Sequence, residues 1–325
     1  MPAVHPSRRG VLRGGLVGGM LVTTGLVTAG CGLDLGRVRF GEQPPPPSPA
    51  PGADELARRR AAESAVNLQA VAAASLGARP DLEPLLTAVV AAHAAHGQAL
   101  GPPATPSATS TETAPTVDPL AELLRLESEA AQQALGDATD VSAGLARLLA
   151  SVGSSRAVHA SLLAGSLGQP PTSAPSVGPP STAAPAVEGA AAEALVTALD
   201  GEYAAVYTFG VIAARLADAQ RERAVISMEA HDLVVERLSD WLAEAELDVP
   251  PSAPAYQVPA LASAADAVAL ATSIEEQVAV LDASLVAAAT GDLRAAAADL
   301  LVQRALAASA WRGAGVPFPG LPELA

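Results

Sequence analysis

The sequence predicts an all-α protein built from two tandem four-helix bundles. Half of its 325 residues are apolar but only 2% are aromatic, so alanine, leucine and valine must fill the cores. Alanine and leucine favour closely packed helices, whereas sheets are enriched in aromatic and β-branched residues. Apolar residues also recur at alternating spacings of three and four over several long segments, which is the period of an amphipathic helix.

The first bundle is expected over residues 53–168. Its helical segments are Asp54–Leu76, Leu82–Leu100, Pro119–Leu135 and Val141–Leu167. Residues 101–117 are rich in Pro, Ser and Thr, and they are predicted to be a disordered insert. This bundle contains no Phe, Tyr or Trp, so we expect it to be only modestly stable alone.

The second bundle is expected over residues 187–325. Its helical segments are Glu188–Ala217, Gln220–Ala245, Ser263–Ala289 and Leu293–Arg312. Residues 169–186 before it form a linker that is rich in Pro, Ser and Thr. Because this linker has little apolar content, the two bundles are predicted to fold as separate units.

Residues 1–30 have the order of a bacterial export signal. The pair Arg8 and Arg9 precedes an apolar run that is too short to span a bilayer stably. The arginine pair resembles the twin-arginine export motif, with Val11 where that motif usually has Phe.

Cys31 follows the signal directly and is the one cysteine of the chain. The segment Ala29-Gly30-Cys31 resembles a bacterial lipobox, which predicts lipidation at Cys31. Residues 31–52 contain a run of prolines and are predicted to be an extended spacer. We therefore expect a lipid-anchored protein on the outer face of the cytoplasmic membrane.

The charge of the chain argues against one class of partner. Its formal net charge is −15, so nucleic acid is not expected to bind. The sequence does not indicate an enzyme with a serine or cysteine nucleophile either. It has no Gly-flanked serine elbow, and its cysteine is expected to be the lipidated residue.

Three charged or polar residues fall on inward faces of the second bundle. Glu202 lies on the apolar seam of its first helix, His231 on that of its second and Arg304 on that of its fourth. An unpaired buried charge would cost several kcal/mol. A buried polar cluster of these three residues is therefore predicted.

The second bundle also resembles a known family. The resemblance rests on four segments, which are Glu202-Tyr203-Ala204-Ala205-Val206-Tyr207 with Phe209-Gly210, Trp241-Leu242, Trp311-Arg312 and the tail Phe318-Pro319-Gly320-Leu321-Pro322. They resemble the ferritin-like domain family of actinobacterial exported lipoproteins, a domain of unknown function (DUF4439). The resemblance covers about Glu188 to the C-terminus and implies a ferritin-like bundle.

A ferritin-like di-iron centre needs a Glu from each of two helices and Glu-x-x-His from each of the other two. The second bundle does not meet this requirement, because Met228 stands three residues before His231 and the last helix has no His. The polar cluster is therefore favoured at Glu202. The alternative is a metal site formed by Glu202, His231 and either Glu275 or Glu276.

Candidate metal ligands also face the interior of the first bundle. His93 and His96 are three residues apart on its second helix, which is a spacing that can bind metal. The inward candidates are His93, His96, His159, Glu63 and Glu127. Zinc and iron cannot be distinguished on ligand type. The alternative is that these imidazoles are buried and hydrogen-bonded without a metal.

Two functions remain open. The first is a non-catalytic binding or scaffolding protein of the cell envelope whose partner is an envelope protein or a lipid. The second is a metal-binding protein or a metal-dependent oxidoreductase of ferritin-like type, with its site in the first bundle. No catalytic residue is assigned, and zinc or iron is the only cofactor considered.

Overall fold

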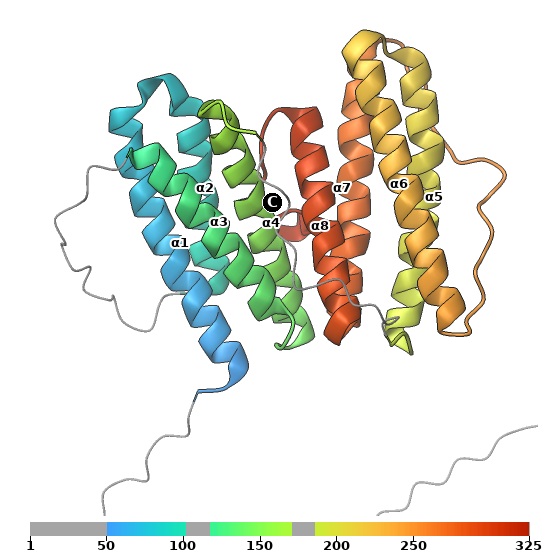
Figure 1. The fold of residues 1–325 in the computed structure, drawn as a ribbon, viewed down its shortest axis with the longest axis horizontal. Coiled ribbons are helices and arrows are strands. Elements are labelled where there is room, and N and C mark those ends of the chain that lie inside the picture. The colour runs from blue at the N-terminus through green and yellow to red at the C-terminus, as the bar shows by residue number, and fades with distance from the viewer. Residues whose placement is uncertain (1–50, 102–117, 171–185, 325) are drawn as a thin grey trace, which may run out of the picture. The chain divides into compact units, whose positions relative to one another are not determined.

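The computed structural model describes residues 51–101, 118–170 and 186–324, and the regular secondary structure of these residues is α-helix apart from short 3-10 helices. The all-α bundle fold predicted from composition and periodicity is confirmed. Figure 1 shows the long helices standing side by side. The export signal, Cys31, nearly all of the 31–52 spacer, residues 102–117 of the insert and most of the 169–186 linker lie outside the described residues.

The described helices form two sets of four. The first helix set is α1 (Ala53–Ala78), α2 (Glu83–Leu100), α3 (Pro119–Ala138) and α4 (Ala143–Ser166). The second helix set is α5 (Ala190–Arg215), α6 (Asp218–Glu244), α7 (Ala264–Ala288) and α8 (Gly291–Arg312). None of these helices is long and apolar enough to cross a membrane.

Local capping explains where several helices begin. Asp118 precedes α3, and its side chain accepts a hydrogen bond from the backbone N–H of Leu120, while Pro119 takes the first helical position. Ser263 and Asp266 form a capping box at the start of α7. Both signals can be read from the sequence, which is why these boundaries agree with the expected ones.

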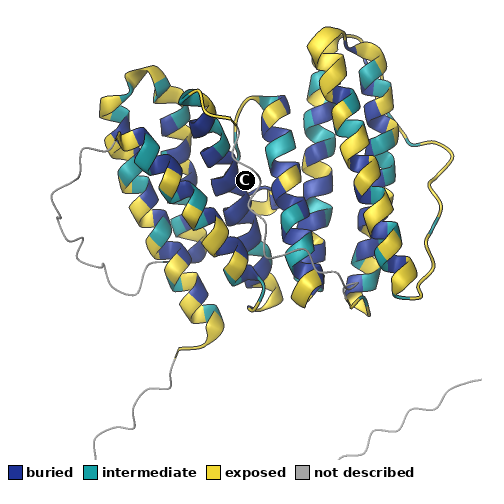
Figure 2. Ribbon diagram, viewed as in Figure 1, coloured by how far each residue is buried: buried dark blue, intermediate teal, exposed yellow. Residues whose placement is uncertain are grey.

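Helix α1 contributes mainly small residues to the core of the first helix set. On α1 the buried positions are mainly alanines, with Ala57, Ala61, Ala65 and Ala72 almost completely inaccessible. Figure 2 shows the buried faces of the helices turned toward one another. Small side chains let the helix backbones approach closely, so polar side chains on neighbouring helices can meet inside the bundle.

The two helix sets are packed into one compact unit, Ala50–Ala325. Helix α4 contacts both α7 and α8, and one continuous hydrophobic cluster includes residues of both sets. Arg294 of α8 reinforces this contact, because it donates hydrogen bonds to the carbonyl oxygens of Thr139 and Val141 in the α3–α4 turn. Separate folding of the two bundles stays a prediction. For it to hold, each helix set must fold without its contacts to the other set.

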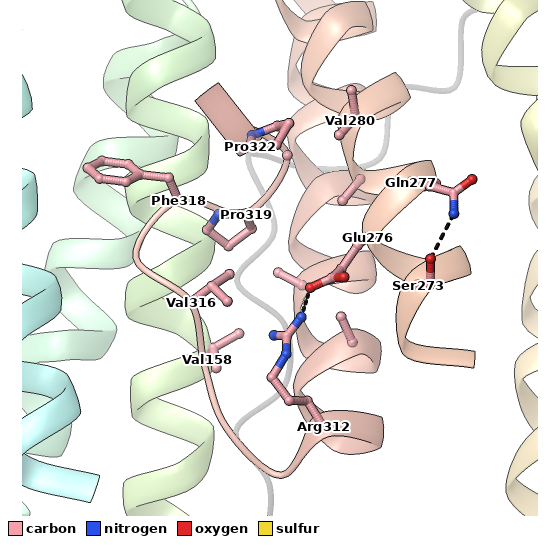
Figure 3. Close-up of a pocket in the computed structure, with 14 residues that line it drawn as sticks. Val158, Ser273, Glu276, Gln277, Val280, Arg312, Val316, Phe318, Pro319 and Pro322 are labelled. Carbon is pink, nitrogen blue, oxygen red and sulfur yellow. Dashed lines mark hydrogen bonds and ion pairs between the residues drawn. The ribbon is translucent and has the colours of Figure 1, made fainter. Parts of the chain in front are cut away.

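The C-terminal tail, residues 313–324, adds a second link between the sets. Figure 3 shows it passing between α4 and α7. Ser151 and Ser155 of α4 donate hydrogen bonds to the carbonyl oxygens of Pro319 (2.7 Å) and Val316 (3.0 Å). At Gly320 φ is +74°, and a Cβ there would lie 2.5 Å from the carbonyl oxygen of Ala279. Only glycine fits this close turn against α7.

Candidate functional site

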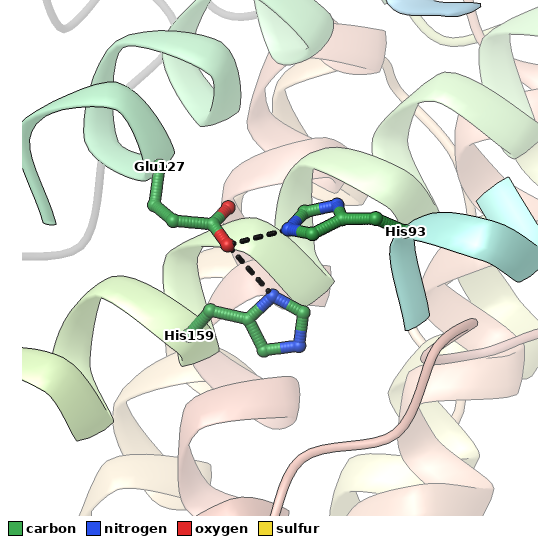
Figure 4. A group of neighbouring side chains, drawn as sticks. All are labelled: His93, Glu127 and His159. Carbon is green, nitrogen blue, oxygen red and sulfur yellow. Dashed lines mark hydrogen bonds and ion pairs between the residues drawn. The ribbon is translucent and has the colours of Figure 1, made fainter. Parts of the chain in front are cut away.

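Three helices of the first set bring two imidazoles to one carboxylate. His93 of α2 places Nε2 2.7 Å from Glu127 Oε1, and His159 of α4 places Nδ1 3.2 Å from the same oxygen. Figure 4 shows both rings directed at that single atom of α3. All three side chains are buried. We call His93, Glu127 and His159 the first centre.

Burial and charge determine how the first centre is protonated. Burial raises the pKa of Glu127, but its interactions with His159 and His93 outweigh burial and bring the pKa to about 2. Burial lowers the pKa of His93, and its contact with Glu127 offsets this only in part. Glu127 is therefore an anion at neutral pH, and neutral His93 donates its Nε2 hydrogen to it.

Arg156 supplies a buried positive charge beside the first centre. It lies one turn before His159 and is only 1% exposed. Its guanidinium donates hydrogen bonds to the carbonyl oxygens of Ala130 (3.2 Å) and Ala61 (3.1 Å). Burial lowers its pKa to about 10, while the charge of Glu127 acts in the opposite direction. Arg156 thus balances the charge of Glu127 while its hydrogen bonds go to backbone carbonyls.

The first centre fits a single divalent transition metal. Its three ligand atoms lie within 4.8 Å of one another. Two atoms bound to one tetrahedral zinc ion at about 2.0–2.2 Å lie about 3.4 Å apart, so the observed 2.7 and 3.2 Å would widen by less than about 1 Å when a metal binds. Within the described residues, Glu127 Oε2 and His93 Nδ1 are buried without a hydrogen-bond partner. Two imidazoles and one carboxylate form a ligand set that suits zinc or ferrous iron.

The other two predicted ligands lie outside the first centre. His96 is buried next to His93, but its Nε2 is hydrogen-bonded to the carbonyl oxygen of Pro317 at 2.7 Å. Its ring makes edge contacts with the rings of His93 and Phe318. Glu63 is exposed, so the inward face predicted for it is wrong. Helix α1 buries a row of alanines instead, and Glu63 falls outside that row.

The second helix set encloses a separate group of charged residues, which we call the second centre. His231 Nδ1 lies 2.5 Å from Glu202 Oε2, and Arg304 Nη1 lies 3.2 Å from His231 Nε2. Arg304 Nη1 also donates to Glu275 Oε2 at 3.4 Å. The structure therefore brings Glu202, His231 and Arg304 together, with Glu275 as a fourth member. Glu276 is half exposed and pairs with Arg312.

The guanidinium of Arg304 lies among the groups that would have to bind a metal at the second centre. Its Nε is 3.7 Å from Glu202 Oε1, and its Nη1 contacts both His231 and Glu275. Burial lowers the pKa of His231, but its hydrogen bonds to the two glutamates outweigh burial and raise it. The carboxylates of Glu202 and Glu275 are thus paired with the Arg304 guanidinium and the His231 imidazole.

Asp282 is a buried residue of the second set that sequence reasoning missed. It lies two turns after Glu275 on α7, and neither carboxylate oxygen has a hydrogen-bond partner among the described residues. Burial, reinforced by the charge of Glu202, raises its pKa well above the usual value. Burial therefore disfavours the charged form of Asp282 in the folded protein. Its place two turns after Glu275 on the inward stripe of α7 is the signal that could have identified it.

A repeated spacing could have identified Arg156 from the sequence. Glu127 and Arg156 are 29 residues apart, and so are Glu275 and Arg304. Each pair consists of a buried Glu on the third helix of its set and a buried Arg on the fourth. The two sets thus share a carboxylate and arginine framework, but the arginine takes a different position in each.

A family model matches most of the second helix set. Residues 194–323 match the family described as a domain of unknown function, DUF4439. One similar solved structure is the crystal structure of a conserved hypothetical protein, rv2844, from Mycobacterium tuberculosis. It is 28% identical over 38% of this chain and 89% of that chain, with a TM-score of 0.37. No curated protein matches the chain.

Proposed function

We propose that this chain is a non-catalytic binding protein of the cell envelope that binds one divalent transition metal at the first centre. The observation that carries the proposal is the convergence of His93 Nε2 and His159 Nδ1 on Glu127 Oε1. The ligands come from three different helices, so the fold itself sets their separation. A packed helical scaffold of this kind is pre-organised for binding.

The contrast between the two centres supports the choice of site. In the second centre Arg304 lies among Glu202, His231 and Glu275, and its charge replaces that of a metal ion. In the first centre the corresponding Arg156 is hydrogen-bonded to backbone carbonyls instead. The ligand atoms of Glu127 and its two histidines are therefore left facing one another. A di-metal oxidoreductase of ferritin type would need more carboxylate ligands than the first centre offers.

The proposed place of action is the outer face of the cytoplasmic membrane. This proposal rests on the sequence of the export signal and on Cys31 as its lipidated residue. Replacing Cys31 with Ala should release the protein from membranes or leave its precursor unprocessed. Mass spectrometry of the membrane-extracted protein should find the lipid on Cys31, and an unmodified Cys31 would refute the anchor.

Metal titration tests the proposed binding site. Full-length protein in detergent, freed of metal by chelator and dialysis, should bind one equivalent of Zn²⁺ or, under anaerobic conditions, of Fe²⁺ in isothermal titration calorimetry. Bound metal should also raise the melting temperature, because it binds the folded state only. His159→Gln should remove this binding.

His96→Gln is the matched control for the metal site. His96 is a buried histidine one turn from His93, but it is hydrogen-bonded to the tail instead of Glu127. This variant should keep stoichiometric metal binding. The proposal is wrong if the wild type binds no metal, or if His96→Gln and His159→Gln lose metal equally while both remain folded by circular dichroism.

A further inference from the structure

Helix α6 lies at the edge of the second helix set. It packs mainly against α5, and near its start Arg223 donates a hydrogen bond to the carbonyl oxygen of Ala310 on α8. Figure 1 shows α7 and α8 between α6 and the first helix set. One face of α6 is buried in the bundle, so the opposite face is exposed in the described part of the chain.

Two rows of side chains run along this exposed face. Ile226 and Leu233 form an apolar row, and Glu222, Glu229 and Glu236 form an acidic row. The members of each row are seven residues apart, so they lie almost directly above one another on the helix. The rows are neighbours, because Ile226 lies four residues after Glu222 and three before Glu229. We call these five residues the α6 face.

The apolar row is exposed to an extent that the fold alone does not explain. Leu233 is 63% exposed and Ile226 is 58% exposed, which makes them the two most exposed large apolar side chains in the described part of the chain. A single exposed apolar residue is common on a soluble protein. Two of them in one heptad-spaced row, beside a row of charges, form the pattern of a helix that packs against a second helix.

The acidic row determines the charge of the partner. The carboxylates of Glu222, Glu229 and Glu236 have no hydrogen bond or ion pair with any other residue that the structure describes. Helix α6 carries seven acidic side chains and three arginines, and two of these, Arg221 and Arg223, donate to backbone carbonyls of the bundle. The α6 face therefore repels a second copy of itself and attracts a cationic helix.

From this pattern we infer that the α6 face docks a basic amphipathic helix of a partner protein. The apolar residues of the partner pack on Ile226 and Leu233, and its lysines or arginines pair with the flanking glutamates. Because charge attraction contributes, the complex should weaken as the ionic strength rises. No residue of the α6 face belongs to the first or the second centre, so this inference goes beyond metal binding and does not depend on it.

The probe is a synthetic helical peptide three heptads long, in which each heptad carries one leucine, three lysines and three alanines. Two matched peptides have the same length: one has glutamate in place of every lysine, and the other has alanine in place of every leucine. Fluorescence anisotropy with the full-length protein in non-ionic detergent, with empty micelles as the blank, should show saturable binding of the probe. Each matched peptide should bind at least about tenfold more weakly, because it lacks either the charge attraction or the apolar contact.

Two double variants locate the docking surface. Ile226→Ser with Glu229→Gln changes one exposed residue of each row, so the fold should be retained while the affinity for the probe falls at least about tenfold. The matched control is Val66→Ser with Glu63→Gln, which changes an exposed apolar residue and a nearby exposed acid on α1. This control should bind the probe as the wild type does. Both double variants should keep the metal equivalent of the wild type.

The outcomes separate this inference from the proposed function. Absence of saturable probe binding, equal binding of the leucine and alanine peptides, or equal affinity of the two double variants would overturn the docking surface. A wild-type dimer in analytical ultracentrifugation that Leu233→Ser converts to a monomer would also overturn it, because a second copy would then cover α6. Absence of metal binding with intact probe binding would overturn only the metal proposal.

Discussion

Arg156 and Arg304 occupy corresponding positions in the two helix sets, yet only Arg304 joins the carboxylate of its own centre. Each follows a buried glutamate by 29 residues, Glu127 in one set and Glu275 in the other. Arg304 donates to Glu275. Arg156 donates to the backbone of α1 and α3, and Glu127 is left to His93 and His159. In the second centre the arginine therefore pairs with the glutamate, whereas in the first centre the glutamate and two histidines contact one another.

Glu202→Gln should destabilise the protein by about 1–3 kcal/mol, because it leaves Arg304 and His231 without the Glu202 carboxylate in a buried site. Chemical denaturation of the full-length protein measures the loss. Metal stoichiometry should stay unchanged, since Glu202 is not in the first centre. Glu222→Gln on the exposed face of α6 is the control and should change stability by less than about 0.5 kcal/mol.

Asp282→Asn should stabilise the protein at pH 7. Burial raises the carboxyl pKa of Asp282 in the folded state above that of the unfolded chain, so ionised Asp282 costs stability when the protein is folded. A raised carboxyl pKa means that stability decreases as the pH rises above the usual aspartate value. Asparagine has a similar shape and no proton to lose, so it removes this cost. A lower melting temperature for Asp282→Asn at pH 7 would contradict the assignment.

Helix positions could be predicted from the sequence because helical periodicity and capping are local signals. Asp118, Pro119 and Ser263 identify helix starts in the chain, and α3 and α7 begin within one residue of the expected position. Packing between the sets could not be predicted in this way. It depends on Arg294 reaching the turn at Thr139 and on the tail crossing α4, which are contacts between distant segments.

The candidate sites were predictable to the extent that they follow helix faces. His93, Glu127 and His159 lie on inward seams, and the structure brings them together. His96 lies on the same seam, but its hydrogen bond goes to the distant carbonyl of Pro317, which periodicity does not reveal. Glu63 is predicted to face inward but is exposed, because α1 mixes alanines with charged and polar residues and its apolar pattern does not define one face clearly.

Phe318→Ala should destabilise the whole unit by about 3–5 kcal/mol. Phe318 is a buried aromatic residue of the tail, and its ring packs against the ring of His96 in the first helix set. Its loss leaves a cavity at the contact between the sets. Leu324→Ala, at an exposed position of the same tail, is the control. Thermal melts should show a large shift for Phe318→Ala only, and equal shifts for the two variants would refute the structural role of the tail.

His96 should make the stability of the protein depend on pH in the acid range. Burial holds the pKa of His96 well below its usual value, and the nearby charge of Arg156 acts in the same direction. The folded state therefore keeps His96 neutral, while the unfolded chain protonates it below about pH 6.5. Since the unfolded state then binds more protons, stability falls as the pH drops, by up to about 1.4 kcal/mol per pH unit.

His96→Gln removes this contribution while it keeps a hydrogen-bonding side chain next to Pro317. At pH 7.5 the variant should be less stable than the wild type, because the substitution disturbs a buried hydrogen bond. The difference should shrink as the pH is lowered toward 5, since only the wild type carries the proton-linked cost. Denaturant midpoints measured at several pH values follow this difference directly. A difference that stays constant from pH 7.5 to 5 would mean that His96 is not held neutral in the folded protein.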